Sequence, residues 1–202
     1  MKRAVALAAA MLAASVASGQ DKPPAVAGQV CAACHAPDGN SVAAANPKIA
    51  GQFAEYLGKQ LRDFKAQGGN APARQSAVMN GMVANLSEAD MKRLAAYYAS
   101  QAYKPSAAAD KDLAALGQRL WRGGDAVHGI PACAGCHGPA GAGIPAQFPR
   151  IAGQYAEYIA AQLTAFREGK RTNDLNGVMR GVAAHMNDGQ IRAVAEYAAG
   201  LR

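Results

Sequence analysis

The chain has 202 residues, of which 50% are apolar and 17% charged, and its formal net charge is +7. This length allows one or two ordinary domains. The basic residues form no run and are not interleaved with aromatic side chains, so we expect no nucleic-acid partner, although the mild positive excess could steer acidic proteins or anionic membrane surfaces.

The N-terminus has the three parts of a secretory signal peptide. Met1–Arg3 is basic, Ala4–Ala14 is apolar, and small residues follow up to Gly19. We therefore expect residues 1–19 to be removed on export. No other stretch approaches the roughly 18 apolar residues that a membrane span needs. The mature chain is then expected in a bacterial periplasm without a transmembrane span.

The pentad Cys31-Ala-Ala-Cys34-His35 is the first motif that carries chemistry, and it returns as Cys133-Ala-Gly-Cys136-His137. C-x-x-C-H is the attachment signature of c-type haem. The two thiols lie on one helical turn, where each can add to a haem vinyl group, and the histidine can then ligate the iron. Together the pentads use every cysteine of the chain and predict two covalently bound haem c groups.

Other uses of these cysteines fit less well. A zinc ribbon needs its C-x-x-C pairs about 15–20 residues apart, and a thioredoxin-like site needs a βαβ context. A disulfide within each pair is chemically reasonable in an oxidising compartment. It would leave the two adjacent histidines without a role.

An internal repeat organises the rest of the chain. Pro47-Lys-Ile-Ala-Gly-Gln52 recurs as Pro149-Arg-Ile-Ala-Gly-Gln154, at the offset of 102 residues that also relates the pentads. Beyond a two-residue length difference near residues 68–76, the offset becomes 100. The joint lies near residues 104–110, which are rich in proline and alanine. We therefore place domain 1 at residues 20–104 and domain 2 at residues 105–202.

Each copy is predicted to be helical, so the expected fold class is all-α. Apolar residues recur with a period near 3.6 in 52–67 and again in 154–168. Segments 24–35 and 113–122 lead into the pentads. The final helices should begin at Ser87 and Asn187, because each is followed three residues later by a side chain that completes a capping box. No convincing alternating strand pattern is present.

The second axial ligand of each iron can be chosen by asking which methionine occurs in both copies. Only Met79 and Met179 match; Met82, Met91 and Met186 face other residue types, and we expect them to be core filler. Methionine opposite histidine is the arrangement of cytochromes c. His128 and His185 are competing donors without a counterpart, and we assign neither a ligand role.

The repeated Pro-[Lys/Arg]-Ile-Ala-Gly-Gln segment has two compatible interpretations. A ligating histidine usually donates its second ring N–H to a carbonyl or carboxylate, and a carbonyl near Pro47 or Pro149 could accept it. The segment could equally be a turn that starts the next helix. Four polar residues in it could contact haem propionates: Lys48, Gln52, Arg150 and Gln154.

With these motifs in place, the chain resembles the dihaem cytochrome c4 family over nearly its full mature length. The resemblance rests on both pentads, the paired Pro-[Lys/Arg]-Ile-Ala-Gly-Gln segments, Tyr-x-x-x-Gln-Leu-x-x-Phe after each, and Met-x-Gly before the last helix. It implies two class I cytochrome c domains related by a pseudo-twofold axis. It also assigns the iron ligands to His35, Met79, His137 and Met179. One departure is that few residues precede Cys31, so the first N-terminal helix should be short.

The function that follows is single-electron transfer by a carrier that is not an enzyme. Resemblance suggests a periplasmic shuttle toward a membrane-bound terminal oxidase in a respiratory chain, with peripheral membrane association as an option. The alternatives are a cytochrome subunit of a periplasmic dehydrogenase, which differs only in partner, and a dihaem peroxidase. A peroxidase would need one iron with an open position, and we find no acid/base pair placed for peroxide cleavage.

Overall fold

The computed structural model describes residues 23–202, so the expected signal peptide lies outside the described residues. Within them the chain is helical, and the only strand-like pairings are isolated bridges. No described helix is both long and apolar enough to cross a membrane. The elements, in chain order, are η1 (Ala27–Cys31), α1 (Ala32–His35), α2 (Ala54–Phe64), α3 (Met79–Val83), α4 (Glu88–Ala99), α5 (Lys111–Gly123), α6 (Ala134–His137), α7 (Ala156–Arg167), η2 (Leu175–Gly177), α8 (Val178–Ala184) and α9 (Asp188–Gly200).

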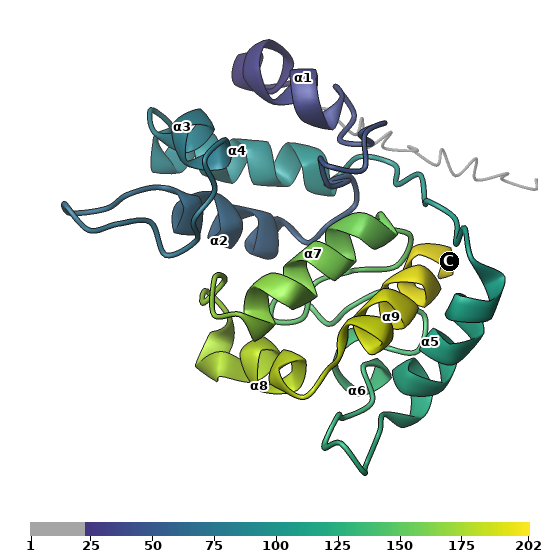
Figure 1. The fold of residues 1–202 in the computed structure, drawn as a ribbon. Coiled ribbons are helices and arrows are strands. Elements are labelled where there is room, and N and C mark those ends of the chain that lie inside the picture. Colours follow the sequence, from purple (N-terminus) through teal and green to yellow (C-terminus); the bar gives the residue numbers. More distant parts are fainter. Residues whose placement is uncertain (1–22) are drawn as a thin grey trace, which may run out of the picture.

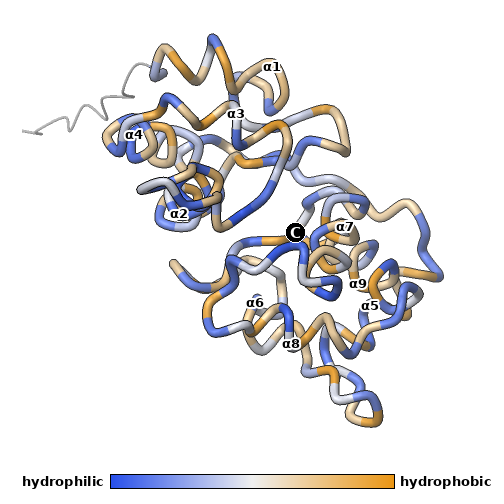
Figure 2. The backbone as a smooth tube through the Cα atoms, turned by 60° about the vertical axis from the view of Figure 1, so that its left-hand side comes forward, coloured by the Kyte–Doolittle hydropathy of each residue, from blue (hydrophilic) through white to orange (hydrophobic). Residues whose placement is uncertain are grey.

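The helices form two lobes of similar design. Elements η1 to α4 make the first lobe and α5 to α9 the second, and an extended linker, residues 100–110, joins them along one side (Figure 1). Each lobe has its own apolar core. One core is centred on Leu94 and Tyr98 of α4, and the other on Trp121 of α5 and Ile191 of α9. The separation into two lobes is also clear in the backbone tube (Figure 2).

The last helix of each lobe begins where the sequence predicts. Ser87 Oγ accepts from the backbone N–H of Asp90, and the Asp90 carboxylate accepts from the N–H of Ser87. Asn187 and Gln190 make the same reciprocal pair at the start of α9. Each box satisfies backbone donors that a helix N-terminus leaves open. Both predicted capping boxes are therefore confirmed.

The amphipathic helices that follow the repeated segment are shorter than predicted. Both begin two residues late, because Phe53 and Tyr155 have extended backbone at the N-cap. Gln52 and Gln154 consequently stand in the loops, where their side chains reach the other lobe. The pattern of apolar residues marks the buried face but does not show where the chain leaves the helix.

The segments around the two matched methionines are helical, which the sequence pattern did not indicate. Met79 opens α3, and Met179 is the second residue of α8. Such short helices lack a readable period and depend on their surroundings. The structure also corrects one expectation: Met82 is 50% exposed, whereas Met91 and Met186 are buried as core filler. In α3 it is Val83 that takes the buried position, at 1% exposure.

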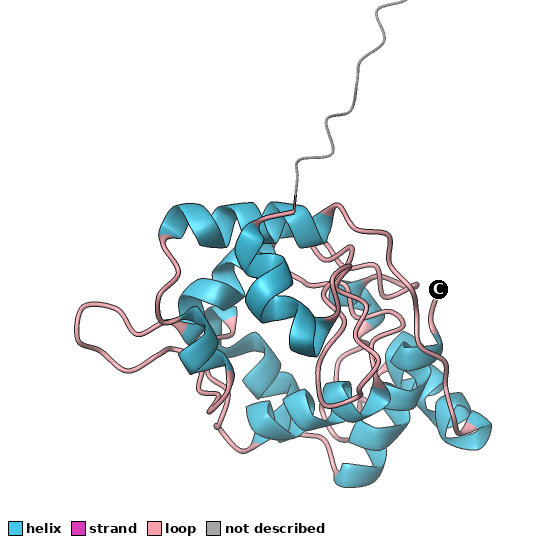
Figure 3. Cartoon of the chain, turned by 90° about the horizontal axis from the view of Figure 1, so that it is seen from above, coloured by secondary structure: helices cyan, strands magenta, loops and turns pink. Residues whose placement is uncertain are grey.

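Loops make up much of the chain between the helices (Figure 3). They need glycine where the backbone turns with positive φ close to other chain segments. Gly39, at φ 75°, passes so close to Tyr98 and to the backbone of Ala50 that a Cβ would overlap both. Gly141 holds the matching place in the second lobe. The close approach folds each loop after the pentad back over its own core.

Candidate haem sites

The two pentads fold in the same way. In each, a single turn of helix ends at the histidine, α1 at His35 and α6 at His137. His35 is 8% exposed and His137 6%. The four cysteines form no disulfide in the structure, so their thiols remain available for thioether bonds. This arrangement agrees with the haem interpretation of both motifs.

Each pentad histidine donates its Nδ1–H to a carbonyl of the repeated segment. His35 Nδ1 lies 2.9 Å from Pro47 O, and His137 Nδ1 lies 2.9 Å from Pro149 O. In a neutral ring that donates from Nδ1, the lone pair is on Nε2, which is the nitrogen that can ligate a metal. The predicted hydrogen bond of the ligating histidine is thus confirmed in both copies.

The surroundings also favour the neutral imidazole. Burial lowers the pKa of His35 and of His137, partly opposed by the bond to the proline carbonyl. Burial raises the pKa of the Cys31 thiol, and it raises that of Cys133 to about 11. Burial therefore favours the neutral form of the first thiol and of the histidine in each pentad, as expected beside a large apolar ring.

The matched methionines lie at the same cores as the pentads. Cys31 and Met79 both pack against the first core, and Cys133 and Met179 both pack against the second. The competing histidines lie outside these cores. His128 and His185 are exposed, and His128 Nδ1 lies 2.6 Å from Asp125 Oδ2 in a surface hydrogen bond.

The two lobes meet through reciprocal contacts that sequence reasoning assigned to other roles. Gln52 Nε2 donates to Arg150 O at 2.8 Å, and Arg150 N donates back to Gln52 Oε1 at 3.0 Å. Gln154 makes the same pair with the backbone of Lys48, at 2.8 and 2.9 Å. Each lobe thus forms hydrogen bonds to the repeated segment of the other lobe. In both cases the residue bound directly follows the proline whose carbonyl accepts from the pentad histidine.

Two buried arginines extend this interface. Arg74 of the first lobe donates to Gln60 of its own lobe and to Tyr158 and Gln162 of the second. Arg171 of the second lobe donates to Gln162 and, across the interface, to Tyr56 and Gln60. The exchange of equivalent partners is what a pseudo-twofold axis produces. The repeat could have pointed to it, since Tyr56 and Gln60 recur at offset 102 as Tyr158 and Gln162.

The residues present fit a covalently bound haem in each lobe. Each lobe supplies two free thiols, a buried neutral histidine with its second nitrogen fixed, and a methionine at the same core. Arg150 adds a further sign, because its Nε is buried without a hydrogen-bond partner. A buried cationic donor of this kind suits an acidic group, and haem carries two propionates.

Comparisons with known proteins agree with this description. The cytochrome c family model matches residues 23–102 and 114–201. Cytochrome c4 of Azotobacter vinelandii is 48% identical over 92% of this chain and 88% of its own length. A thiosulfate dehydrogenase electron acceptor of Thiomonas intermedia is 43% identical over 97% of this chain and 88% of its own.

A solved structure shows the same architecture. The crystal structure of reduced recombinant cytochrome c4 from Pseudomonas stutzeri superimposes with a TM-score of 0.82 at 44% identity, covering 90% of this chain and 99% of that one. The chain therefore belongs to the dihaem cytochrome c4 family: it is an electron-transfer cytochrome rather than an enzyme, with two cytochrome c domains and two covalently bound haem c groups.

Proposed function

We propose that this protein is a periplasmic shuttle that passes single electrons through two irons, each closed by one histidine and one methionine. Cys31 and Cys34 form the thioethers of the first haem, and Cys133 and Cys136 those of the second. His35 with Met79, and His137 with Met179, are the axial ligands. The observation that carries this assignment is the equal Nδ1–carbonyl distance of 2.9 Å at both histidines.

The haem supplies the one-electron chemistry, and the chain keeps its surroundings fixed. Each proline carbonyl orients its histidine and raises the basicity of the ligating nitrogen. The apolar core excludes water, and a methionine opposite histidine raises the reduction potential. Two closed irons leave no position for a substrate, which is why we propose a carrier and not a peroxidase.

We propose the domain and export assignments that go with this role. Residues 1–19 are a cleaved signal peptide, domain 1 spans 20–104 and domain 2 spans 105–202. The family model supports the division, since its first match ends at residue 102 and its second match begins at residue 114. The basic start and apolar run before Gly19 support export to the periplasm.

The ligand assignment is tested by absorption spectra of the haem-loaded protein with and without carbon monoxide. The unmodified protein should show the methionine-to-ferric charge-transfer band and no response to carbon monoxide. Met79→Ala and Met179→Ala should each open one iron, so that half of the haem binds carbon monoxide. Met82→Ala is the matched control and should bind none. Binding to half of the haem in the unmodified protein would favour the peroxidase instead.

The second part of the proposal concerns the electron donor and the electron acceptor. We propose a membrane-bound terminal oxidase as acceptor. The relative named as a thiosulfate dehydrogenase electron acceptor, similar over 97% of this chain, supports such a dehydrogenase as donor. Stopped-flow reduction by a purified thiosulfate dehydrogenase, followed by oxidation with a purified terminal oxidase, tests each step. Slow reduction by the dehydrogenase with fast oxidation by the oxidase would rule out the dehydrogenase as donor and would leave the oxidase as acceptor.

A further inference from the structure

Arg150 is a half-buried cation whose hydrogen bonding is incomplete. Its Nε is buried without a hydrogen-bond acceptor, and among the described residues no carboxylate forms an ion pair with its guanidinium. A buried charged group without compensation is costly, so such groups are normally paired. We therefore expect the partner of Arg150 to be an anion other than the described aspartates and glutamates.

The position of Arg150 indicates which anion is near. It directly follows Pro149, whose carbonyl accepts the Nδ1–H of His137 at 2.9 Å. The side chain thus starts beside the proximal ligand of the second haem. The acidic groups that a haem brings to such a place are its propionates, and a guanidinium binds a carboxylate with charge-assisted hydrogen bonds.

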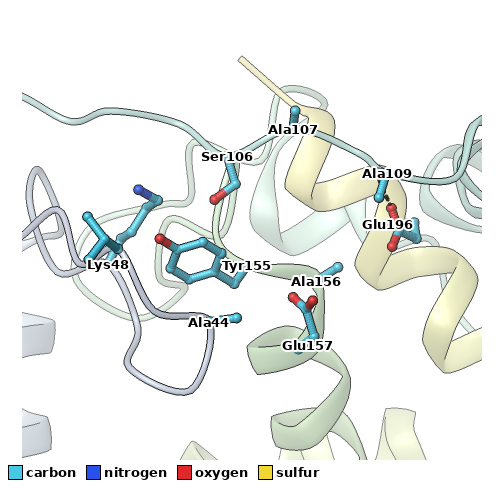
Figure 4. Close-up of a pocket in the computed structure, with 10 residues that line it drawn as sticks. Ala44, Lys48, Ser106, Ala107, Ala109, Tyr155, Ala156, Glu157 and Glu196 are labelled. Atoms are coloured by element: carbon cyan, nitrogen blue, oxygen red, sulfur yellow. Dashed lines mark hydrogen bonds between the residues drawn. The ribbon is translucent and has the colours of Figure 1, made fainter. Parts of the chain in front are cut away.

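The other polar residues of the two repeated segments are occupied elsewhere. The amides of Gln52 and Gln154 are bound to backbone groups across the domain interface. Lys48, the counterpart of Arg150, has its ammonium 3.4 Å from Ser41 O and 4.9 Å from the centre of the Tyr155 ring. Figure 4 shows Lys48 facing Tyr155 and Ser106 at a cavity of about 410 Å³. Of the four candidates, Arg150 alone keeps an unused buried donor.

The inter-domain linker holds the Arg150 side chain in place. The guanidinium carbon lies 4.1 Å from the centre of the Tyr103 ring, a cation–π distance. The Tyr103 hydroxyl donates to Ala152 O, and Ser106 N donates to Gly153 O at 2.7 Å. Gly153 must be glycine here, because φ is 60° and a Cβ would overlap the Tyr103 hydroxyl. Burial raises the pKa of Tyr103 to about 12, so the hydroxyl stays protonated and keeps donating.

We propose that Arg150 binds a propionate of the second haem and that Tyr103 of the linker orients it, so that the linker takes part in setting the reduction potential of that haem. A cation beside the propionate offsets negative charge that would otherwise stabilise ferric iron. Removal of the cation should therefore lower the potential of the second haem. We expect no equivalent at the first haem, because the aromatic neighbour of Lys48 is Tyr155 at the start of α7, which is not part of the linker.

The test is potentiometric titration of the full-length, haem-loaded protein, with each haem assigned by its hyperfine-shifted methyl resonances. Arg150→Gln should change the ferric-to-ferrous ratio of the second haem three- to tenfold at fixed ambient potential, where tenfold corresponds to 59 mV for one electron. Arg150→Lys should retain most of the effect. Tyr103→Leu should give part of the Arg150→Gln shift, and Tyr103→Phe, which keeps the ring, should give less.

Lys48→Gln is the matched control and should change neither ratio more than twofold. An unchanged second haem in Arg150→Gln overturns the proposal, and a shift confined to the first haem overturns the assignment to the second. If Arg150→Gln does not fold, the comparison of Tyr103→Leu with Tyr103→Phe still decides the role of the linker. These potentials are measured against chemical mediators, so a failure here leaves the carrier function intact.

Discussion

The two domains build the same haem site around different N-terminal helices. In domain 2, α5 crosses α9 so closely that a Cβ on Gly117 would overlap the Ala193 carbonyl. In domain 1 the residues opposite α5 at offset 102 lie outside the described residues; the described segment that leads into the pentad is the short η1–α1, and Gly28 on it has nothing within 4 Å of its Cβ position. α4 accordingly carries the exposed Arg93 where α9 carries the buried Ala193. Among the described residues of domain 1, the hydrogen bond from His35 to Pro47 therefore forms without a close helix crossing of this kind.

The aromatic cover of each site is also supplied from different helices. In domain 2, Trp121 of α5 is fully buried and donates its indole N–H to Pro139 O at 3.2 Å. In domain 1 the equivalent carbonyl, Pro37 O, accepts from Tyr97 of α4 at 3.0 Å. Tyr98 beside it is 3% exposed, at the position that α9 gives to Ala198. A larger residue on the last helix thus compensates in domain 1 for the aromatic side chain that α5 supplies in domain 2.

The compensation is incomplete at one place. Domain 1 has an open groove of about 670 Å³ between residues 24–30 and the segment from Gly81 to Leu94. In domain 2 the loop before the pentad lies over the equivalent segment, where Ile130 is 3% exposed and Asp125 accepts from Gln190 at 3.0 Å. Domain 1 therefore has the less complete core, and we expect it to unfold first.

The largest effect should come from the same substitution at the two glycines. Gly117→Ala forces α5 away from α9 and should destabilise domain 2 by about 3 kcal/mol. Gly28→Ala meets no neighbour and should stabilise domain 1 by about 0.5 kcal/mol, because alanine loses less conformational freedom on folding. Guanidinium unfolding followed by circular dichroism measures both. Equal changes in the free energy of unfolding for Gly28→Ala and Gly117→Ala would contradict the difference in helix packing between the two domains.

The sequence repeat predicted those parts of the fold that each domain builds by itself. Both capping boxes, both histidine–carbonyl bonds and the placement of Met79 and Met179 at the cores agree with it. The capping boxes and the histidine–carbonyl bonds join residues three and twelve positions apart, and each methionine packs within its own domain. A repeated pattern therefore carries them from one copy to the other.

Contacts between the domains could not be predicted in this way. Gln52 and Gln154 were candidates for propionate contacts, but they bind backbone groups about a hundred residues away. Their partners depend on how two folded domains face each other, which neither copy encodes alone. The exposure of Met82 has a similar origin, since residues 24–30 leave the groove beside it open.

A smaller effect is expected from the side chains that brace the segment of each matched methionine. In domain 1, Asn80 donates to Phe64 O at 2.7 Å and to Arg74 O at 2.9 Å, and accepts from Ser76 N at 2.8 Å. In domain 2 the equivalent position is Arg180, which donates from N and Nε to the buried Asp174 carboxylate at 3.0 and 2.8 Å. The same brace is thus neutral in one domain and ionic in the other.

Asn80→Ala removes three hydrogen bonds and should destabilise domain 1 by about 1–3 kcal/mol. Asp174→Asn keeps the shape but loses the charge-assisted bond, and should cost domain 2 about 1 kcal/mol. Each variant should lose the methionine-to-iron absorption of its own domain at a lower guanidinium concentration. Loss in the opposite domain would show that the brace acts through the interface.

The smallest effect concerns an ion pair that only domain 1 makes with the linker. The Lys104 ammonium donates to Asp38 Oδ2 at 2.8 Å and holds the pKa of Asp38 at about 2, whereas domain 2 has Ala140 at the equivalent position. The unfolded carboxyl titrates near pH 3.9. Because the folded pKa is the lower one, the stabilisation is present above about pH 4 and is lost as the pH falls through 2.

The pair is exposed, so its contribution should be small and should weaken further with salt. Asp38→Asn should lower the unfolding midpoint slightly at pH 6, and its difference from the unmodified protein should shrink below pH 4 and disappear below about pH 2. Lys104→Met should raise the pKa of Asp38 toward its ordinary value in a carboxyl NMR titration. A difference that does not change with pH would mean that Asp38 acts through its bonds to Asn40 instead. Lys104 would then be held mainly through its backbone N–H, which donates to Asn40 Oδ1 at 2.8 Å.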